Sequence, residues 1–108
     1  MATLWDDFKD MDVRGANSRR GDLLLAGGEG MIEMMKTFRN PLRLMIPGMT
    51  WVSGYRHMRS FARRLKHYND HWDETSKKDK RDVVASLRKT AKVAKISVMV
   101  LRWIVQWG

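Results

Sequence analysis

The most informative side chains of this sequence are basic ones spaced like one face of a helix. Four cations follow one another at intervals of three, four and three residues: Arg56, Arg59, Arg63 and Lys66. On an α-helix this spacing keeps them on one face and places a positive charge about every 5 Å along the axis. Cations repeated at such a distance suit the phosphates of a nucleic acid backbone. This row predicts contact with a polyanion.

A second set of cations lies in the C-terminal third of the chain. On one helix over residues 77–107 its members would fall within an arc of about 80°. No acidic residue follows Asp82, so the sequence offers no counter-charge to the last of these cations. We predict that five of them join the first row in binding nucleic acid or anionic lipid: Lys77, Arg81, Arg88, Lys92 and Lys95.

The positive charge of the chain is confined to its second half. The 108 residues carry a formal net charge of +9. Residues 1–50 contain seven basic and seven acidic side chains, whereas residues 51–108 contain fourteen basic and five acidic ones. Such asymmetry is typical of proteins that contact nucleic acid or anionic lipid. The neutral first half leaves another interpretation open, a helical adaptor that docks a partner protein through this half.

Residues 93–107 are apolar around most of the circumference of the helix predicted there. A helix of this kind has to be buried somewhere. The run is short and carries Lys95 and Arg102, so a transmembrane helix is not predicted. The core, a subunit interface and the membrane surface remain as its surroundings. We predict a homo-oligomer interface, with a membrane interface as the alternative, formed by Val98, Leu101, Trp103, Ile104, Val105 and Trp107.

The spacing of the apolar residues predicts an all-α protein, a compact bundle of four or five helices forming a single domain over residues 1–108. Thr3 is placed to cap a short first helix. Residues 12–21 have the composition of a flexible link. Residues 1–20 are therefore a candidate for a mobile N-terminal arm.

Three further helices complete the predicted bundle. Residues 22–39 carry a methionine stripe at helical spacing, although three glycines weaken it. A helix over about residues 49–68 follows, and a long C-terminal helix over residues 77–107 begins at the capping residue Ser76. The apolar stripe of the helix at 49–68 is formed by Trp51, Tyr55, Met58, Ala62 and Leu65.

Catalytic and metal-binding patterns are weak. The chain has no cysteine, which excludes disulfides and thiolate chemistry. His67 and His71 stand four residues apart, but no third ligand is fixed by spacing, and no triad is indicated. We therefore predict no enzyme activity, no cofactor and no metal. Trp72, in a polar break, is the tryptophan whose setting suits stacking on bases. Arg20-Gly21-Asp22 matches the integrin tripeptide, a match that we attribute to chance.

Together these features predict a non-enzymatic, self-assembling basic protein that binds a polyanion, with the backbone of DNA or RNA as the first interpretation. A peripheral membrane or matrix-like protein that binds anionic lipid is the alternative. The N-terminus lacks the basic and apolar regions of a signal peptide, so we expect an intracellular protein, associated with a membrane or a virion in the alternative. In composition the chain resembles small viral core and matrix proteins. That resemblance implies assembly with nucleic acid or membrane, and it assigns no residue roles.

Overall fold

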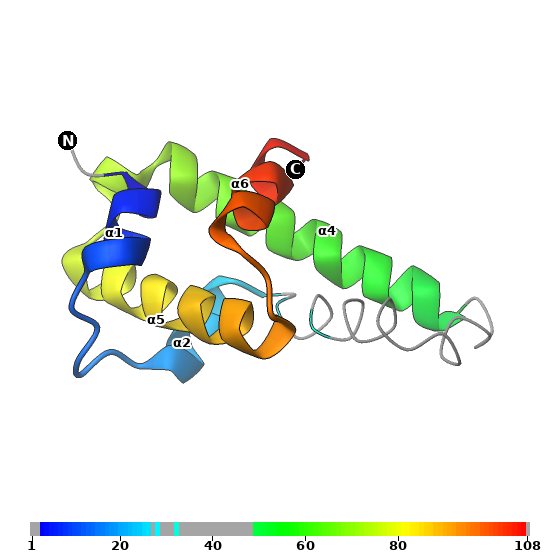
Figure 1. Cartoon of the computed structure of the whole chain (residues 1–108), viewed down its shortest axis with the longest axis horizontal. Helices are drawn as coiled ribbons and strands as arrows, with labels where there is room; N and C mark the ends of the chain where they lie inside the picture. Colours follow the sequence, from blue (N-terminus) through cyan, green and yellow to red (C-terminus); the bar gives the residue numbers. More distant parts are fainter. Residues whose placement is uncertain (1–2, 27, 29–31, 33–48, 108) are drawn as a thin grey trace.

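The computed structural model describes residues 3–26, 28, 32 and 49–107, the side chains of 49–53 and 107 excepted (Figure 1). No strand occurs in these ranges, and the prediction of an all-α protein is confirmed. The methionine stripe predicted within residues 22–39 lies outside the described residues. The helices are α1 (Leu4–Asp10), α2 (Ser18–Leu24), α4 (Met49–Asp70), the 3-10 turn η2 (Trp72–Glu74), α5 (Lys77–Ala94) and α6 (Val98–Trp107).

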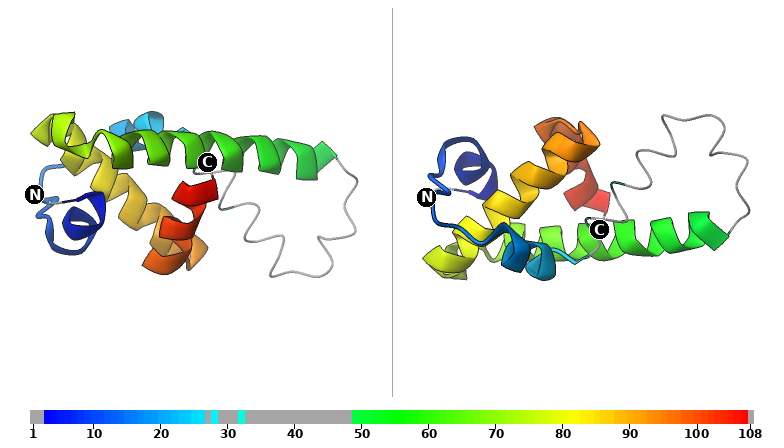
Figure 2. Two further views of the ribbon diagram at one scale, coloured as in Figure 1. Left: turned by 90° about the horizontal axis from the view of Figure 1, so that it is seen from above. Right: turned by 90° about the horizontal axis from the view of Figure 1, so that it is seen from below.

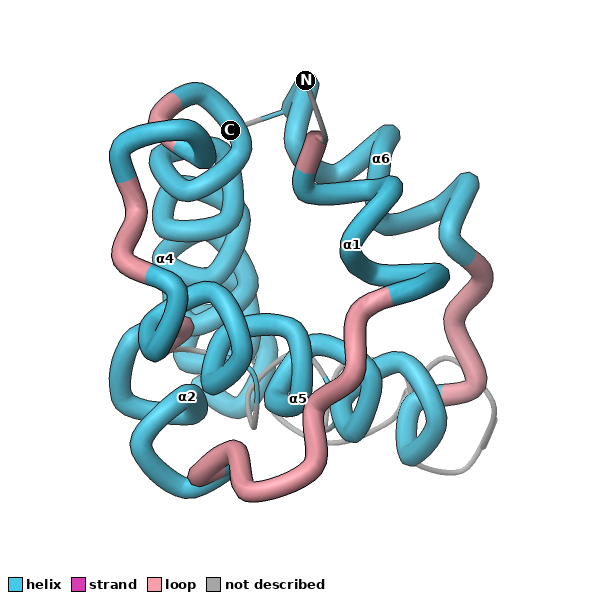
Figure 3. Tube along the Cα trace, turned by 90° about the vertical axis from the view of Figure 1, so that its left-hand side faces the viewer, coloured by secondary structure: helices cyan, strands magenta, loops and turns pink. Residues whose placement is uncertain are grey.

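The longest described helix is α4, with 22 residues, and it runs along the length of the fold (Figures 1 and 2). After η2 the chain reverses into α5, and α6 then returns to pack against the middle of α4. α1 and α2 both contact α5, from different sides (Figure 3). α5 is therefore the element on which the N-terminal helices assemble.

One hydrophobic core draws on every one of these helices. Its largest members come from segments far apart in the chain, and each contributes roughly 1.5–3 kcal/mol through burial. Trp72, predicted as a base-stacking residue, is one of them and is 1% exposed. Its indole Nε1 donates a hydrogen bond of 2.6 Å to the carboxylate of Asp7, and the Nζ of Lys80 lies 5.6 Å from the ring centre. The stacking prediction is wrong, because this indole holds the junction of α4 and α5 against α1.

The buried face of α4 is rotated from the predicted one. Ala62 and Leu65 are buried as predicted, but Phe61 is fully buried and Tyr55 is 45% exposed. The observed stripe passes through Gly54, Met58, Phe61, Leu65 and Tyr68, again at intervals of three and four residues. The predicted intervals of three and four residues agree with the observed stripe, but the predicted face of α4 is rotated, because the prediction omits Phe61. The side chain of Trp51 lies outside the described residues.

The predicted long C-terminal helix is two helices. α5 ends at Ala94, and Lys95 adopts the left-handed conformation with φ 54°. The Ile96 N–H then donates to the Ala91 carbonyl at 2.9 Å, and the Ser97 hydroxyl accepts from the Val100 N–H at the start of α6. The left-handed residue costs about 1–2 kcal/mol. Folding α6 back onto α4 buries several aliphatic side chains, which outweighs that cost.

The segment predicted as a mobile arm is folded onto α5 over its described residues 3–20. Thr3 caps α1 as predicted, in a reciprocal capping box with Asp6. Leu4 is fully buried in the core. The predicted link also contains an unpredicted helix start, because Asn17 caps α2 by accepting from the Arg20 N–H at 3.1 Å.

The tripeptide Arg20-Gly21-Asp22 lies within α2 and faces α5. Arg20 pairs with two acids of α5, Asp79 at 2.6 Å and Asp82 at 2.8 Å. Asp22 accepts from the Ser86 hydroxyl at 2.6 Å. Gly21 is buried so closely against α5 that an added Cβ would collide with the Asp82 carbonyl oxygen. The tripeptide is thus the contact by which α2 docks.

Candidate polyanion-binding surface

The α4 row, Arg56, Arg59, Arg63 and Lys66, is exposed along the outer face of its helix. At about 100° per residue, the four side chains fall within an arc of about 80°. The buried stripe of Phe61 and Leu65 lies on the opposite side of the helix. None of the four is paired with a carboxylate among the residues that the structure describes. The row therefore presents four charges to solvent over about 15 Å of helix.

Along α4 and η2, the acidic residues lie beyond the C-terminal end of the row. Asp70 ends α4, and Asp73 and Glu74 follow in η2, all three exposed. Within α4 no acid precedes Asp70. Because like-signed charges along a helix face reinforce each other's field, the row is a strongly positive strip with an acidic end.

The second predicted set of cations does not form a continuous surface, because α1 lies across it. Arg88 is half-buried and donates three hydrogen bonds to carbonyl oxygens near the end of α1: Phe8 at 2.8 Å, Met11 at 2.8 Å and Asp7 at 3.3 Å. The last carbonyls of a helix have no partner within it, so a guanidinium is a favourable cap. Arg88 was predicted to contact a polyanion, but its Nε and Nη2 donors are engaged within the protein, so we do not include it in the proposed surface.

Arg81 is also drawn towards the N-terminal segment. The hydrogen bonds from Arg14 lower the pKa of Asp12 most, and the charges of Arg81 and Arg88 lower this pKa further. Lys77, Lys92 and Lys95 are exposed. Lys77 and Lys92 stand about 22 Å apart along α5, too far to act as one row. The middle of the α5 set therefore lies beside the N-terminal segment, where Arg88 is bound by backbone carbonyl oxygens and Asp12 lies within the electrostatic reach of Arg81.

The predicted interface on α6 divides into a buried and an exposed part. Leu101, Ile104 and Val105 are 0%, 4% and 6% exposed within the chain's own core. Their assignment to an oligomer or membrane interface is wrong, because the break after α5 lets α6 turn them onto α4. Val98 is half-buried, and the side chain of Trp107 lies outside the described residues.

An apolar strip remains on the outside of α6. Met99, Val100 and Trp103 are 80%, 40% and 61% exposed, and Arg102 is exposed beside them. Among the described helices, none combines the length and apolar character that a membrane-spanning segment needs. The strip is therefore a surface feature, apolar side chains next to a cation.

The two histidines of α4 and its end interact with each other. The rings of His67 and His71 stack with centroids 4.6 Å apart, and His71 Nδ1 lies 3.0 Å from the His67 carbonyl oxygen. Within the described part of the chain no group of three or more His, Asp or Glu side chains is placed to hold a metal ion. The pair is best explained as packing at the end of α4.

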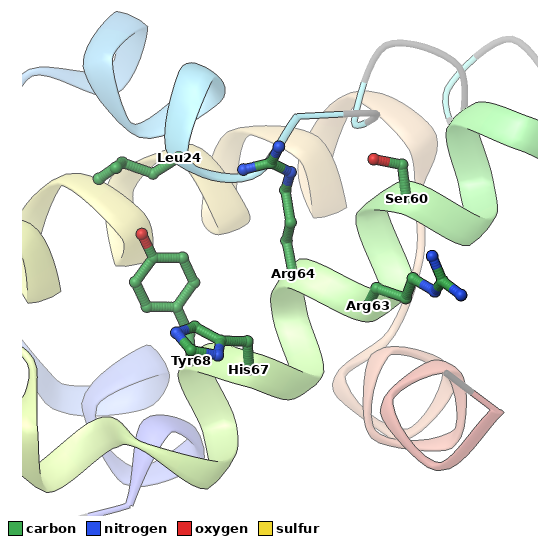
Figure 4. Close-up of a pocket in the computed structure, with 6 residues that line it drawn as sticks. All are labelled: Leu24, Ser60, Arg63, Arg64, His67 and Tyr68. Atoms are coloured by element: carbon green, nitrogen blue, oxygen red, sulfur yellow. The ribbon is translucent and has the colours of Figure 1, made fainter.

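A hollow lies beside the α4 row, and no pattern in the sequence predicts it. It has a volume of about 450 Å³ and lies between the end of α2 and α4 (Figure 4). Arg64, next to Arg63 in the chain, extends across it towards the segment that follows α2 (Figure 4). Its outline depends on where α2 docks, which local spacing does not reveal. The lining residues are Leu24, Ser60, Arg63, Arg64, His67 and Tyr68.

Comparison with protein-family models, curated proteins and solved structures gave no match. The function is therefore argued from the surfaces described above.

Proposed function

We propose that this protein binds the phosphate backbone of a nucleic acid through the α4 row, without catalysing a reaction. The observation that carries the proposal is the exposure of Arg56, Arg59, Arg63 and Lys66 on one helix face without a carboxylate partner among the described residues. Other cations, such as Arg14 and Arg20, pair with acids of the protein itself. What sets the row apart is that four such charges follow one another on a single helix face, which suits a polyanion.

The dimensions of the row fit a nucleic acid strand. The row extends over about 15 Å. One strand of a duplex presents a phosphate about every 3.4 Å, so about four phosphates lie within reach. Arginine and lysine dominate the surface, and such side chains position a protein on phosphates without reading sequence by themselves. We therefore expect binding with little sequence preference.

A salt titration tests this proposal. The probe is a fluorescein-labelled single-stranded oligonucleotide of mixed sequence, and the measurement is fluorescence anisotropy at rising NaCl. Four phosphate contacts predict that log K falls with log salt with a slope of about −3. A slope near zero, or no binding at low salt, would reject the proposal.

Anionic lipid is a second candidate ligand, favoured by the α6 strip. Met99, Val100 and Trp103 are exposed beside Arg102, an arrangement typical of helices that lie at a membrane surface. Lipid binding is measured by co-sedimentation with vesicles of phosphatidylserine and phosphatidylcholine, and vesicles of phosphatidylcholine alone are the control. Replacing Trp103 by alanine should reduce lipid binding and leave oligonucleotide binding unchanged.

Self-association stays a prediction, and it now rests on this same strip. In a two-fold dimer the strip of one copy meets the strip of the other, which brings two copies of Arg102 close together. That repulsion weighs against a tight dimer. Light scattering at several protein concentrations tests self-association, since a mass near 12.7 kDa at every concentration would exclude an oligomer.

A further inference from the structure

The hollow between α2 and α4 is lined almost entirely by hydrogen-bond donors. Arg64 contributes a guanidinium group, Ser60 and Tyr68 contribute hydroxyl groups, and His67 contributes an imidazole, whereas Arg63 lines the edge and its guanidinium extends away from Arg64 (Figure 4). Leu24 closes the side formed by α2 (Figure 4). Among the lining residues that the structure describes, none carries a carboxylate or a side-chain amide. These residues suit a ligand that supplies acceptor oxygens and negative charge.

This donor set discriminates between parts of a nucleotide. A nucleobase carries both donors and acceptors on its edges. A phosphate carries acceptors alone, and arginine binds it with two parallel N–H groups. The hydroxyls of Ser60 and Tyr68 can donate to the remaining oxygens. The lining thus matches an oxyanion better than a base.

The surroundings of Tyr68 keep its hydroxyl a donor. Burial, and then the charge of Asp79, raise the pKa of Tyr68, whereas Arg64 and Arg20 lower it less. The hydroxyl is consequently protonated at neutral pH. Asp79 would repel an anion, but its carboxylate is paired with Arg20 at 2.6 Å, a guanidinium that it shares with Asp82. This pairing weakens the repulsion.

We propose that this hollow binds the terminal phosphate of a nucleic acid strand whose backbone lies along the α4 row. The proposal rests on the function proposed above and names the part of the ligand that enters the hollow. Arg63 belongs to both surfaces, because it is a member of the row and lines the hollow. A strand on the row therefore passes the mouth of the hollow, and a strand end can enter it.

A terminal phosphate fits this position better than a bridging one. It projects from the end of the chain, whereas a bridging phosphate is held on both sides by sugars. It also carries up to a second negative charge near neutral pH, since its second pKa is about 6. Arg64, which extends across the hollow, matches that higher charge, and Arg63 adds positive charge at its edge (Figure 4).

The test compares oligonucleotides of one sequence with a 5′-phosphate, with a 3′-phosphate and with neither, by anisotropy competition at fixed salt. At least one phosphorylated end should bind the wild-type protein about tenfold more tightly than the unphosphorylated strand, the size expected of a charged hydrogen bond. Arg64→Gln should reduce that ratio to about one. Arg56→Gln removes the same charge from the row alone, so it should weaken all three probes and preserve the ratio.

The outcomes separate the two proposals. If the unphosphorylated strand binds with the expected salt dependence but neither terminal phosphate adds affinity, the terminal-phosphate site is rejected and the α4 row stands. If Arg64→Gln and Arg56→Gln lower the ratio equally, the gain is general electrostatics and the site is also rejected. If no strand binds, the row fails as well. Circular dichroism of both variants verifies that the helices persist.

Vesicles distinguish a lipid source of the same phosphate chemistry. Phosphatidic acid ends in a phosphate monoester, and phosphatidylserine of equal charge density does not. Binding that prefers phosphatidic acid, is lost in Arg64→Gln and is absent with phosphorylated strands would overturn the nucleic acid source. Equal binding to both vesicles supports the strand end as the ligand.

Discussion

Arg20 donates a hydrogen bond of 2.8 Å to the carboxylate of Asp82, across 62 residues of sequence. Asp82 is 2% exposed, and it also accepts from the Asn17 N–H at 2.8 Å. One buried carboxylate of α5 thus accepts hydrogen bonds both from a guanidinium and from the backbone N–H just before α2. Two acids of the second half of the chain, Asp79 and Asp82, are thus paired with Arg20, whereas the α4 row has no such partner among the described residues.

Because Gly21 packs closely against α5, the addition of one methyl group at this position should destabilise the fold. Gly21→Ala places a Cβ against the Asp82 carbonyl oxygen and within 2.8 Å of Ser86 Cβ. Overpacking of this kind lowers the free energy of unfolding by about 1–3 kcal/mol. Urea denaturation measures it. Arg19→Ala, at an exposed position of the same helix, should change stability little, and equal effects of the two would contradict the docking of α2.

The surroundings of Asp82 predict a pH dependence. Burial alone raises the pKa of Asp82, but the hydrogen bonds from Asn17 and Arg20 outweigh it, so the pKa lies below its ordinary value of 3.8. The unfolded chain therefore takes up this proton first as the pH falls. The stabilisation is complete above about pH 4–5 and is lost as the pH falls through the lower, folded-state pKa.

Asp82→Asn tests this linkage. It should lower the free energy of unfolding by about 1.5–3 kcal/mol at pH 7, the usual worth of hydrogen bonds to a charged group. The difference from wild type should shrink below about pH 4, because the unfolded chain takes up the proton there and the stabilisation from the ionised carboxylate is progressively lost. Chemical denaturation at pH 7, 5 and 3 gives both quantities, with the exposed Asp73→Asn as the control. A difference that is constant with pH would refute the buried pair.

The left-handed conformation of Lys95 predicts an unusual order of stability. Lys95→Gly and Lys95→Ala remove the same side chain. At φ 54° glycine avoids the Cβ strain, so Lys95→Gly should be more stable than Lys95→Ala by about 1 kcal/mol. In an uninterrupted helix the order reverses by a similar amount. Thermal or urea unfolding of this pair thus distinguishes two helices from one.

Because α6 has one buried and one exposed face, substitutions of its neighbouring apolar residues should lower stability by very different amounts. Leu101→Ala should cost about 2–5 kcal/mol, because it empties a fully buried site. Met99→Ala, at a position 80% exposed, should change stability by less than about 0.5 kcal/mol. If Leu101→Ala instead left the free energy of unfolding unchanged and split a wild-type assembly into monomers in light scattering, Leu101 would belong to an interface between copies.

Local patterns predicted the parts of the fold that depend on neighbours in sequence. The helical period, the caps at Thr3 and Ser76, and the exposed spacing of the α4 row all follow from residues within a few positions of one another. Features set by distant contacts were missed. The roles of Arg88 and Trp72 depend on α1, which lies far from both in sequence.

The break at Lys95 was missed for a different reason. The apolar stripe continues through Ile96, so the period gives no sign of an end, and the stop uses a lysine where glycine is usual. Ser97 was the one local signal, since serine is a common helix cap. The hollow beside α4 was missed because it exists only once α2 has docked beside that helix.

We propose that the α4 row, and not positive charge in general, binds nucleic acid. Two variants of equal charge test this proposal: Arg56→Gln with Arg59→Gln and Lys66→Gln on α4, and Lys77→Gln with Lys78→Gln and Lys92→Gln on α5. All six side chains are exposed, so both variants should fold.

The measurement is the anisotropy-derived Kd for one oligonucleotide as a function of salt. We predict that the α4 variant binds far more weakly than the wild type and that its salt slope becomes shallower by about 2, at about 0.7 for each phosphate that is no longer neutralised. The α5 variant should bind nearly as the wild type does. Equal weakening in both variants would contradict the account, because binding would then follow net charge and no particular face of the molecule.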